Sequence, residues 1–252
     1  MKIVFIRHAE PDYTIDSLTE KGWREAEILS ERVAKWKVDD AYVSPLGRAK
    51  DTASFSLAKL GMEPQIRTWL QEFYYRIEDP ETGKERIAWD FYPEFFTGQE
   101  ELHNKNEWYL TRMMQTGEMK KHFDEAVDGF NEVMKKHGYI AEGNGLYRIE
   151  KHSDETIVFF CHLGVSFVII GYLLGIAPPV LWQGVFIAPT SITVLASEER
   201  DGEHAAFRIQ RLGDASHLTN AGEPISQSGY FAEVFDDTGV TELISLRGND
   251  NN

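Results

Sequence analysis

The sequence predicts an α/β fold, a three-layer sandwich in which helices flank both faces of a mostly parallel central sheet. Two runs rich in β-branched and aromatic residues, 3–6 and 156–160, have the pattern of buried strands. Each run leads to a histidine, and an apolar helical stretch follows the second one at once. Strand-like and helical segments alternate along most of the chain, and this alternation is typical of a parallel sheet covered by helices.

The first 72 residues contain most of the predicted parallel half. The strand at 3–6 ends at Arg7 and His8, and Pro11 prevents its easy continuation. Thr19 is a suitable N-cap for a helix whose apolar residues recur at steps of three and four. The remaining elements expected here are a strand at 41–43, a helix at about 46–60 closed by Gly61, and a strand at 65–70 with Glu72 just beyond it.

Arg48 lies in the first turn of the helix expected at 46–60. A cation at this position opposes the helix dipole and is mildly unfavourable. The sequence shows no structural gain that offsets this cost, and such a local conflict is typical of a functional residue.

Residues 73–150 differ in composition from the segments on either side. Aromatic and acidic residues crowd together, and periodicity is poor until an amphipathic helix at about 119–136. We expect 73–150 to be an insertion that caps the site, so that residues 1–252 form a single domain. The elements expected after it are a core strand at 156–160, a buried helix ending near Gly175, strands at 191–195 and 207–212, and a loosely packed polar C-terminal arm over about 213–252.

Composition and charge limit the class of function. A formal net charge of -15 disfavours general electrostatic binding to nucleic acid or to anionic membranes, so a phosphate site must be a local positive pocket. The lone cysteine, Cys161, excludes an intrachain disulfide and is expected to be a buried side chain. The N-terminus has no signal-peptide pattern, and Pro178 and Pro179 interrupt the most apolar stretch, 165–181. We therefore expect a cytoplasmic protein without a membrane span.

Short motifs follow the expected strands and helices in a fixed order. They read RHAE at 7–10, LTEKG at 18–22, SPLGRAKDTA at 44–53, LQE at 70–72, CHLG at 161–164 and SITVL at 191–195. Together these motifs resemble the histidine phosphatase superfamily, also called the phosphoglycerate mutase-like family. The resemblance covers residues 1–72 and 156–196 and says little about the insertion or the tail.

The resemblance implies roles for five residues. His8 would attack phosphorus and become a phosphohistidine. Arg7 and Arg48 would bind the phosphate oxygens through their planar guanidinium groups. His162 would also bind a phosphate oxygen, and Glu72 would protonate the leaving group and then activate water. No metal ion or other cofactor is expected, because these arginines and the second histidine supply the positive charge.

Two aspects of the chemistry stay open at this point. Glu10, Asp12 and Glu78 are alternatives to Glu72 as the acid. Residues 73–76 read FYYR and lack the signature of the glycolytic mutases, which favours hydrolysis of a small phosphorylated metabolite. The alternatives are mutase-type phosphoryl transfer and a non-catalytic member that binds a phosphorylated ligand.

The candidates for substrate specificity lie outside the shared motifs. Thr14 stands where many members have an asparagine that contacts phosphate, and Arg76 and Arg86 are candidates for binding a second anionic group. Leu163 replaces a family glycine and makes the expected pocket wall more apolar. The expected partner is a small phosphorylated substrate, while a homodimer and the physiological substrate stay undetermined. The other histidines lack metal-ligand spacing and are expected on the surface: His103, His122, His137, His152, His204 and His217.

Overall fold

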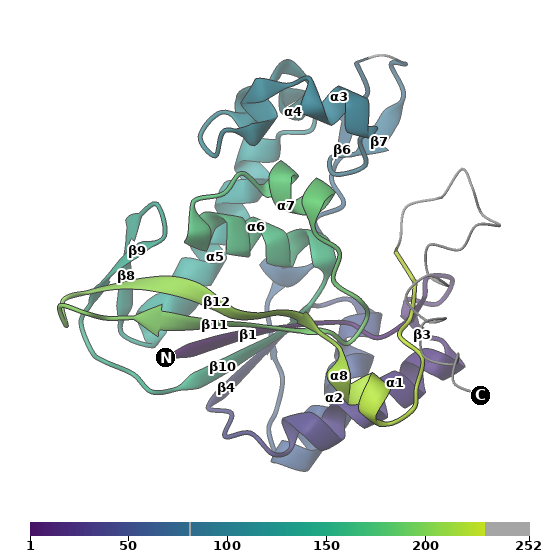
Figure 1. Cartoon of the computed structure of the whole chain (residues 1–252), viewed down its shortest axis with the longest axis vertical. Coiled ribbons are helices and arrows are strands. Elements are labelled where there is room, and N and C mark those ends of the chain that lie inside the picture. Colours follow the sequence, from purple (N-terminus) through teal and green to yellow (C-terminus); the bar gives the residue numbers. More distant parts are fainter. Residues whose placement is uncertain (81, 230–252) are drawn as a thin grey trace, which may run out of the picture.

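The computed structural model describes residues 1–80 and 82–229 (Figure 1). Within these residues, an eight-stranded mixed sheet forms the centre of the molecule, and helices cover both of its faces. The three-layer α/β architecture predicted from the sequence is confirmed. In spatial order the strands are β5 (Gln65–Ile66), β4 (Asp40–Val43), β10 (Thr156–Cys161), β1 (Lys2–Arg7), β11 (Ile192–Glu198), β12 (His204–Asp214), β9 (Leu146–Ile149) and β8 (Tyr139–Gly143).

The sheet has a parallel half and an antiparallel half. β5, β4, β10 and β1 run parallel, whereas β11, β12, β9 and β8 pair antiparallel with their neighbours. The sheet is therefore more mixed than the sequence indicated. Short connections at 199–203 and 144–145 join β11 to β12 and β8 to β9. Connections this short join antiparallel strands, because a parallel crossover needs a dozen residues or more.

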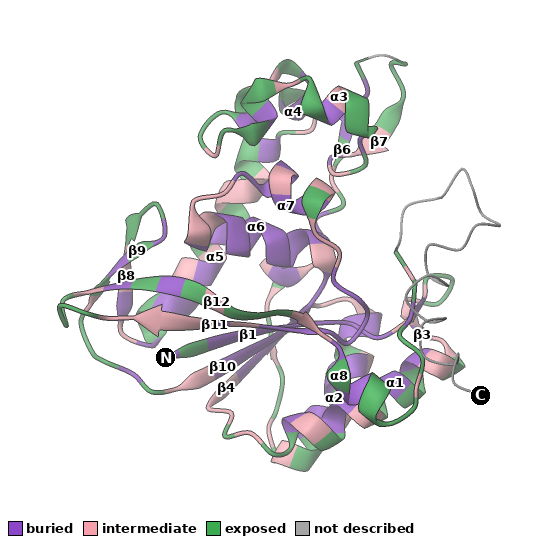
Figure 2. Cartoon of the chain, viewed as in Figure 1, coloured by how far each residue is buried: buried purple, intermediate pink, exposed green. Residues whose placement is uncertain are grey.

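Successive side chains of β1 point to opposite faces of the sheet, and each face has its own hydrophobic core. Ile3 and Phe5 belong to one core, and Val4 and Ile6 belong to the other. Figure 2 shows the buried ribbon where helices meet the sheet. The covering helices are α5 (Met119–Lys136) and α6 (Leu163–Leu174) on the first face, and α1 (Glu20–Val33) and α2 (Gly47–Leu60) on the second. Two shorter helices pack on them: α7 (Pro178–Gly184) lies against α6, and α8 (Ser216–Asn220) lies against α1.

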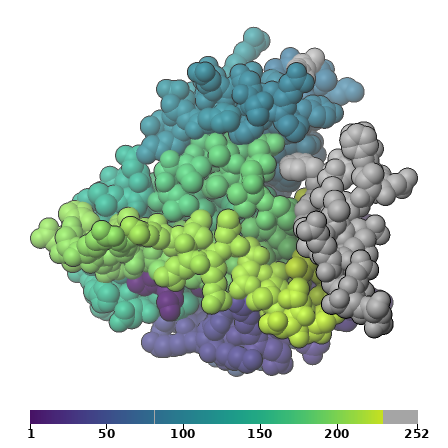
Figure 3. Space-filling model, viewed as in Figure 1, coloured from purple at the N-terminus to yellow at the C-terminus, as the bar shows by residue number. Residues whose placement is uncertain are grey.

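The segment predicted as an insertion, 73–150, has two different parts. Its second part belongs to the sandwich, because α5 covers a face of the sheet and the hairpin β8–β9 extends its edge. Its first part lies over α6 and α7 at the top of the molecule (Figures 1 and 3), where the buried ring of Trp108 lies 5.5 Å from that of Trp182. This first part comprises β6 (Arg76–Glu78), β7 (Glu85–Ile87), α3 (Pro93–Thr97), the 3-10 turns η2 (Glu100–His103) and η3 (Trp108–Leu110), and α4 (Arg112–Thr116).

The strand expected at 65–70 is shorter than predicted. Only β5 pairs with β4, and the chain then forms the 3-10 turn η1 (Thr68–Leu70). The ring of Trp69 in this turn packs 6.0 Å from Phe159 and 6.3 Å from Phe130. Packing of this large, partly buried ring against the core draws the chain away from the sheet edge.

One further helix agrees with the sequence analysis. The apolar stretch predicted as a buried helix forms α6, which ends at Gly175 in a left-handed cap. No helix in the part of the chain that the structure describes is long and apolar enough to cross a membrane. A short antiparallel pair, β2 (Pro11–Asp12) and β3 (Ser17–Leu18), follows the first strand.

The polar arm predicted from about 213 begins at the end of β12. In its described part, Ser226 is buried and its hydroxyl donates to Glu10 Oε2 at 2.6 Å. Arg7 Nη2 donates to the carbonyl oxygen of Ser228 at 3.0 Å. This part is more closely packed than its polar composition indicated. Residues 230–252 lie outside the described residues.

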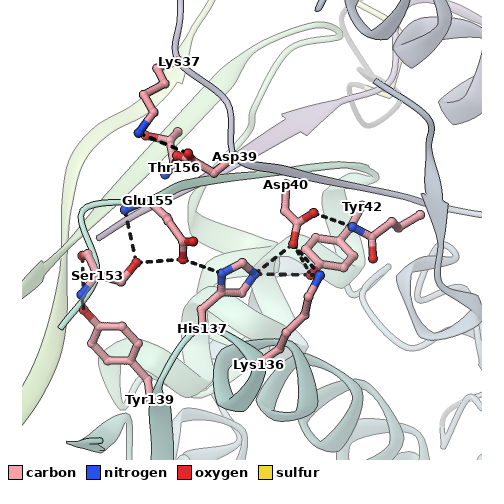
Figure 4. A network of polar contacts seen from close by, with 11 residues as sticks. Lys37, Asp39, Asp40, Tyr42, Lys136, His137, Tyr139, Ser153, Glu155 and Thr156 are labelled. Carbon is pink, nitrogen blue, oxygen red and sulfur yellow. Dashed lines mark hydrogen bonds and ion pairs between the residues drawn. The ribbon is translucent and has the colours of Figure 1, made fainter. Parts of the chain in front are cut away.

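A polar network ties α5 to the amino ends of the parallel strands (Figure 4). Arg7 and His8 lie at the opposite, carboxyl ends of these strands. His137 lies between two carboxylates: its Nδ1 is 2.7 Å from Glu155 Oε2, and its Nε2 is 3.3 Å from Asp40 Oδ2. Asp40 opens β4 and Glu155 directly precedes β10. His137 and His217 are both buried, so the prediction that these two histidines lie on the surface is wrong.

Candidate active site

The two histidine motifs meet at the carboxyl ends of β1 and β10. These strands pair in parallel with Arg7 opposite Cys161, and the His8 amide donates to the Cys161 carbonyl at 2.9 Å. The rings of His8 and His162 therefore lie close together, with 5.0 Å between their centroids, and both are buried. This is the edge of an open α/β sheet at which ligands usually bind.

Neighbouring groups orient both imidazoles. His8 Nδ1 lies 2.7 Å from the carbonyl oxygen of Ala9. A carbonyl only accepts hydrogen bonds, so Nδ1 carries the proton and Nε2 keeps its lone pair. His162 Nε2 lies 2.7 Å from the hydroxyl of Ser44.

Both imidazoles are neutral near pH 7. Burial, and then the charge of Arg7, lowers the pKa of His8 well below its usual 6.5. Burial, and then His8, lowers the pKa of His162 in the same way. A neutral His8 is competent as a nucleophile without first losing a proton.

Two arginines flank the histidines, and hydrogen bonds to other parts of the chain hold their guanidinium groups in place. Arg7 Nη1 donates to the carbonyl oxygen of Ile187 at 2.6 Å, in addition to its bond with Ser228. Arg48 Nη1 donates to Asp16 Oδ1 at 2.6 Å. Among the described residues, Nε of Arg7 and Nε of Arg48 are buried without a hydrogen-bond partner. Buried donors of this kind need an acceptor, and an oxyanion in the site would supply one.

Asp16 resolves the unfavourable position of Arg48. Its Oδ2 accepts a hydrogen bond from the amide of Gly47 at 2.7 Å, so one carboxylate serves both the guanidinium and the N-terminus of α2. Asp16 has a positive φ of 48°, a conformation that aspartate tolerates better than most residues. Asp16 was not among the residues predicted from the sequence, because no periodicity or motif links positions 16 and 48.

Glu72 lines the same cavity as Arg7 and Arg48, and backbone amides hold one of its oxygens. Phe73 N and Val165 N donate to Oε1 at 2.7 and 3.2 Å. Burial raises the pKa of Glu72 above its usual 4.5, although these amides and Arg7 oppose the shift. The site therefore favours a protonated carboxyl group more than solvent does.

The other acids considered for this role lie elsewhere. Glu10 accepts hydrogen bonds from Thr19 and Ser226, Asp12 accepts from Thr14, and Glu78 is exposed on β6. None of the three lines the site cavity within the described residues.

A cavity of about 580 Å³ opens over Arg7, Arg48 and Glu72. Leu163 lies in its wall, as the sequence analysis expected. The remaining lining residues are mainly aromatic and aliphatic: Tyr13, Leu46, Tyr74, Ile87, Trp89, Trp182, Gln183, Gly184, Val185, Phe186 and Gly229. Part of the insertion thus closes one side of the site.

The predicted specificity residues lie outside this cavity within the described residues. Thr14 bonds to Asp12 through both its amide and its hydroxyl, at 2.9 and 2.5 Å. Arg86 Nε forms an ion pair with Asp79 Oδ2 at 2.8 Å, and Arg76 is exposed. The structure therefore does not bring these three candidates together with Arg7, His8, Arg48, Glu72 and His162.

Neither a reactive thiol nor a set of metal ligands lies in the described part of the site. Cys161 is fully buried, and burial raises the pKa of its thiol, so the thiol stays protonated and unreactive. Within residues 1–80 and 82–229, no three His, Cys, Asp or Glu side chains gather in a way that could hold a metal ion.

Comparison with known proteins agrees with this geometry. The model of the histidine phosphatase superfamily (branch 1) matches residues 3–210. No curated protein sequence matches the chain.

Several solved structures share the fold. A mycobacterial glucosyl-3-phosphoglycerate phosphatase is 18% identical with a TM-score of 0.57, covering 84% of this chain and 98% of its own. The Entamoeba histolytica phosphoserine phosphatase bound to 3-phosphoglyceric acid is 19% identical with a TM-score of 0.57, covering 86% and 98%. The α-ribazole phosphatase of Shigella flexneri is 17% identical with a TM-score of 0.54, covering 85% and 97%.

The family model extends from the first strand into β12 and so includes both histidines, both arginines and Glu72. These are the residues that the fold gathers at one edge of the sheet. The chain belongs to the histidine phosphatase superfamily (branch 1).

Proposed function

We propose that this protein hydrolyses a small phosphorylated metabolite through a phosphohistidine intermediate on His8, without a metal ion. The observation that carries the proposal is the hydrogen bond between His8 Nδ1 and the Ala9 carbonyl. It fixes the tautomer in which Nε2 is the nucleophilic nitrogen, beside His162 and the two arginines. The similar structures named as phosphatases act on phosphorylated small molecules, which supports the same class here.

In the first step, His8 Nε2 attacks phosphorus and the bond from phosphorus to the leaving oxygen breaks. Arg7 and Arg48 bind the peripheral phosphate oxygens, and His162 stabilises the charge in the transition state. Glu72 gives its proton to the leaving oxygen. Because the amides of Phe73 and Val165 hold Oε1, the other carboxyl oxygen is the one that donates.

In the second step, water attacks the phosphohistidine and the P–N bond breaks. Glu72, now a carboxylate, accepts a proton from the water, so that inorganic phosphate leaves and both residues return to their starting states. The Ala9 carbonyl stabilises the positive charge that the imidazole carries while it is phosphorylated.

Trapping the phosphoenzyme tests this proposal. Wild-type protein mixed with a ³²P-labelled aryl phosphate in excess chelator should give an acid-labile, base-stable label, and His8→Ala should give neither label nor turnover. His152→Ala, an exposed histidine away from the site, is the matched control and should behave like wild type. Full turnover by His8→Ala, or loss of activity on chelation with recovery on adding magnesium, would contradict the mechanism.

A further inference from the structure

The cavity over the phosphate-binding arginines indicates which leaving group the enzyme accepts. We propose that the substrate is a phosphomonoester of an uncharged, largely apolar alcohol, about the size of a ring system or a hexyl chain. This inference rests on the phosphomonoesterase function proposed above and narrows its substrate class.

The charge in the cavity matches one phosphoryl group and no second anion. Among the described residues, Arg7 and Arg48 are the cations that line the cavity. The phosphoryl dianion uses both of them. Glu72 also lines the cavity, and its carboxyl group gives a second anion no attraction. A carboxylate on the leaving group would therefore lose its hydration without gaining a positive partner.

The arginines of the insertion do not provide a second anion site in the cavity. Arg86 Nε pairs with Asp79 Oδ2 at 2.8 Å, and Arg86 Nη1 donates to the Asp90 carbonyl at 2.8 Å. Arg76 is exposed on β6 and does not line the cavity. The sequence made these arginines candidates for binding a second anionic group, and neither lines the cavity within the described residues.

The walls beyond the arginines are mainly apolar on both sides, and their polar side chains are Gln183 and the phenols Tyr13 and Tyr74. Ile87 and Trp89 come from the insertion, and Leu163, Trp182 and Phe186 come from α6, α7 and the loop after it. Surfaces of this kind gain free energy from covering carbon, at roughly 25 cal/mol per Å² of apolar area buried. A sugar or an amino acid offers them little apolar area.

The polar atoms of the two indoles bind the protein backbone. Trp89 Nε1 donates to the Phe73 carbonyl at 2.8 Å, and Trp182 Nε1 donates to the Gly164 carbonyl at 3.1 Å. The indole rings therefore offer carbon surface to a ligand, and their N–H groups are already used. A hydroxyl-rich leaving group would lose hydrogen bonds to water that these indoles do not replace.

The cavity is also larger than a phosphoryl group requires. Its volume of about 580 Å³ lies in the range of pockets that bury most of a drug-sized ligand. A phosphoryl group occupies only the end next to Arg7 and Arg48. The rest of the volume is bounded mainly by the apolar walls and fits a ring system or a medium alkyl chain.

A series of n-alkyl monophosphates from propyl to octyl tests the inference. Their alcohols are almost equally acidic, so chain length changes burial and leaves the chemistry of bond cleavage unchanged. We expect kcat/KM to rise roughly fourfold per methylene up to about hexyl, and phosphoserine and 3-phosphoglycerate to fall below propyl phosphate. A flat series, or phosphoserine above hexyl phosphate, would overturn the inference.

A matched pair of variants locates the effect. Ile87→Arg places a cation in the cavity wall and should abolish the chain-length dependence while raising the preference for 3-phosphoglycerate over hexyl phosphate by at least about tenfold. Leu110→Arg changes an exposed residue of the same insertion, outside the cavity, and should leave both measurements unchanged. An unchanged alkyl series in Ile87→Arg, with the same melting temperature as wild type, would overturn the assignment of this wall.

Failure of this inference differs from failure of the proposed function. If 4-nitrophenyl phosphate is hydrolysed and His8→Ala is inactive, but the alkyl series is flat, the substrate class alone is wrong. If the wild-type protein hydrolyses neither 4-nitrophenyl phosphate nor any member of the series, the phosphatase function is wrong, and the inference falls with it.

Discussion

Gly164 leaves only enough space for the carboxyl group of Glu72: a Cβ atom on residue 164 would lie 2.6 Å from Glu72 Oε1. A contact this short requires one of the two groups to move. The same oxygen accepts hydrogen bonds from the amides of Phe73 and Val165. The absence of a side chain at position 164 therefore helps to set the position of the proposed general acid.

Gly164→Ala should displace Glu72 and reproduce part of the effect of Glu72→Gln. We expect Glu72→Gln to slow hydrolysis of an alkyl phosphate by about 10²–10⁴-fold, because the leaving alkoxide needs a proton. Hydrolysis of 4-nitrophenyl phosphate should fall much less, because nitrophenolate leaves unaided. Gly164→Ala should show the same contrast at smaller size when kcat is measured on both substrates.

Gly98→Ala is the control for this pair, because a Cβ atom there meets only ordinary contacts, the nearest at 3.5 Å. It should leave both rates within twofold of wild type. Equal losses on the alkyl and aryl substrates in Glu72→Gln would mean that Glu72 only shapes the cavity.

At acid pH, the decrease in kcat/KM should follow the protonation of His8. The pKa of His8 lies well below 6.5, so the nucleophile stays neutral until the pH falls through this lowered value. On the alkaline side, activity on alkyl phosphates should fall as Glu72 ionises, and its raised pKa extends activity to higher pH. Glu72→Gln should remove the alkaline limb and keep the acid limb. Measuring both proteins on the same substrate cancels the ionisation of the phosphate itself.

Asp16 should matter for phosphate binding although it does not touch the substrate site. Asp16→Asn keeps an acceptor for the Gly47 amide but removes the charge that holds Arg48. We expect KM, and the inhibition constant of inorganic phosphate, to rise about tenfold, which is typical of losing a hydrogen bond between charged groups. Loss of kcat with unchanged phosphate inhibition would assign Asp16 another role.

Thr14→Ala provides the matched control for Asp16, since Thr14 lies in the same loop and bonds only to Asp12 among the described residues. Its kinetic constants should stay within twofold of wild type.

His137 should contribute to stability and leave catalysis unchanged. His137→Ala removes the group between Asp40 and Glu155 (Figure 4), which takes one polar partner from each carboxylate and should cost about 1–3 kcal/mol of unfolding free energy. Because the network lies at the amino ends of the strands, kcat/KM should not change. The exposed His152→Ala should have little effect on either quantity.

The same network makes the free energy of unfolding depend on pH in the acid range. Hydrogen bonds from His137 and then Ser153 lower the pKa of Glu155 below its usual 4.5. The ionised Glu155 carboxylate therefore contributes fully to stability above pH 4.5. This contribution is lost as the pH falls through the lowered pKa of Glu155 in the folded protein. Urea unfolding between pH 6 and 3 should show a smaller acid-dependent loss in His137→Ala than in wild type. An equal loss in both proteins would assign the acid sensitivity to other carboxylates.

The sequence by itself determined the α/β fold and the residues that meet at the sheet edge. Arg7 ends one buried strand, and His8 and His162 directly follow the two strands, whose parallel pairing places their ends side by side. The hydrophobic runs of these strands are local patterns, so they are readable without the fold. Arg48 and Glu72 were found through their motifs, and the cost of Arg48 in a helix N-terminus pointed in the same direction.

Only the tertiary structure decided what surrounds these residues. Asp16 meets Arg48 and Ser228 meets Arg7 across long stretches of chain, and such contacts leave no periodic signal in the sequence. The positions of Arg76 and Arg86 depend on which face of an irregular insertion is turned toward the cavity. In segments without a regular period, packing against the rest of the molecule selects which side chains are buried. The composition of the cavity wall, and with it the leaving group that the site accepts, is set by that packing.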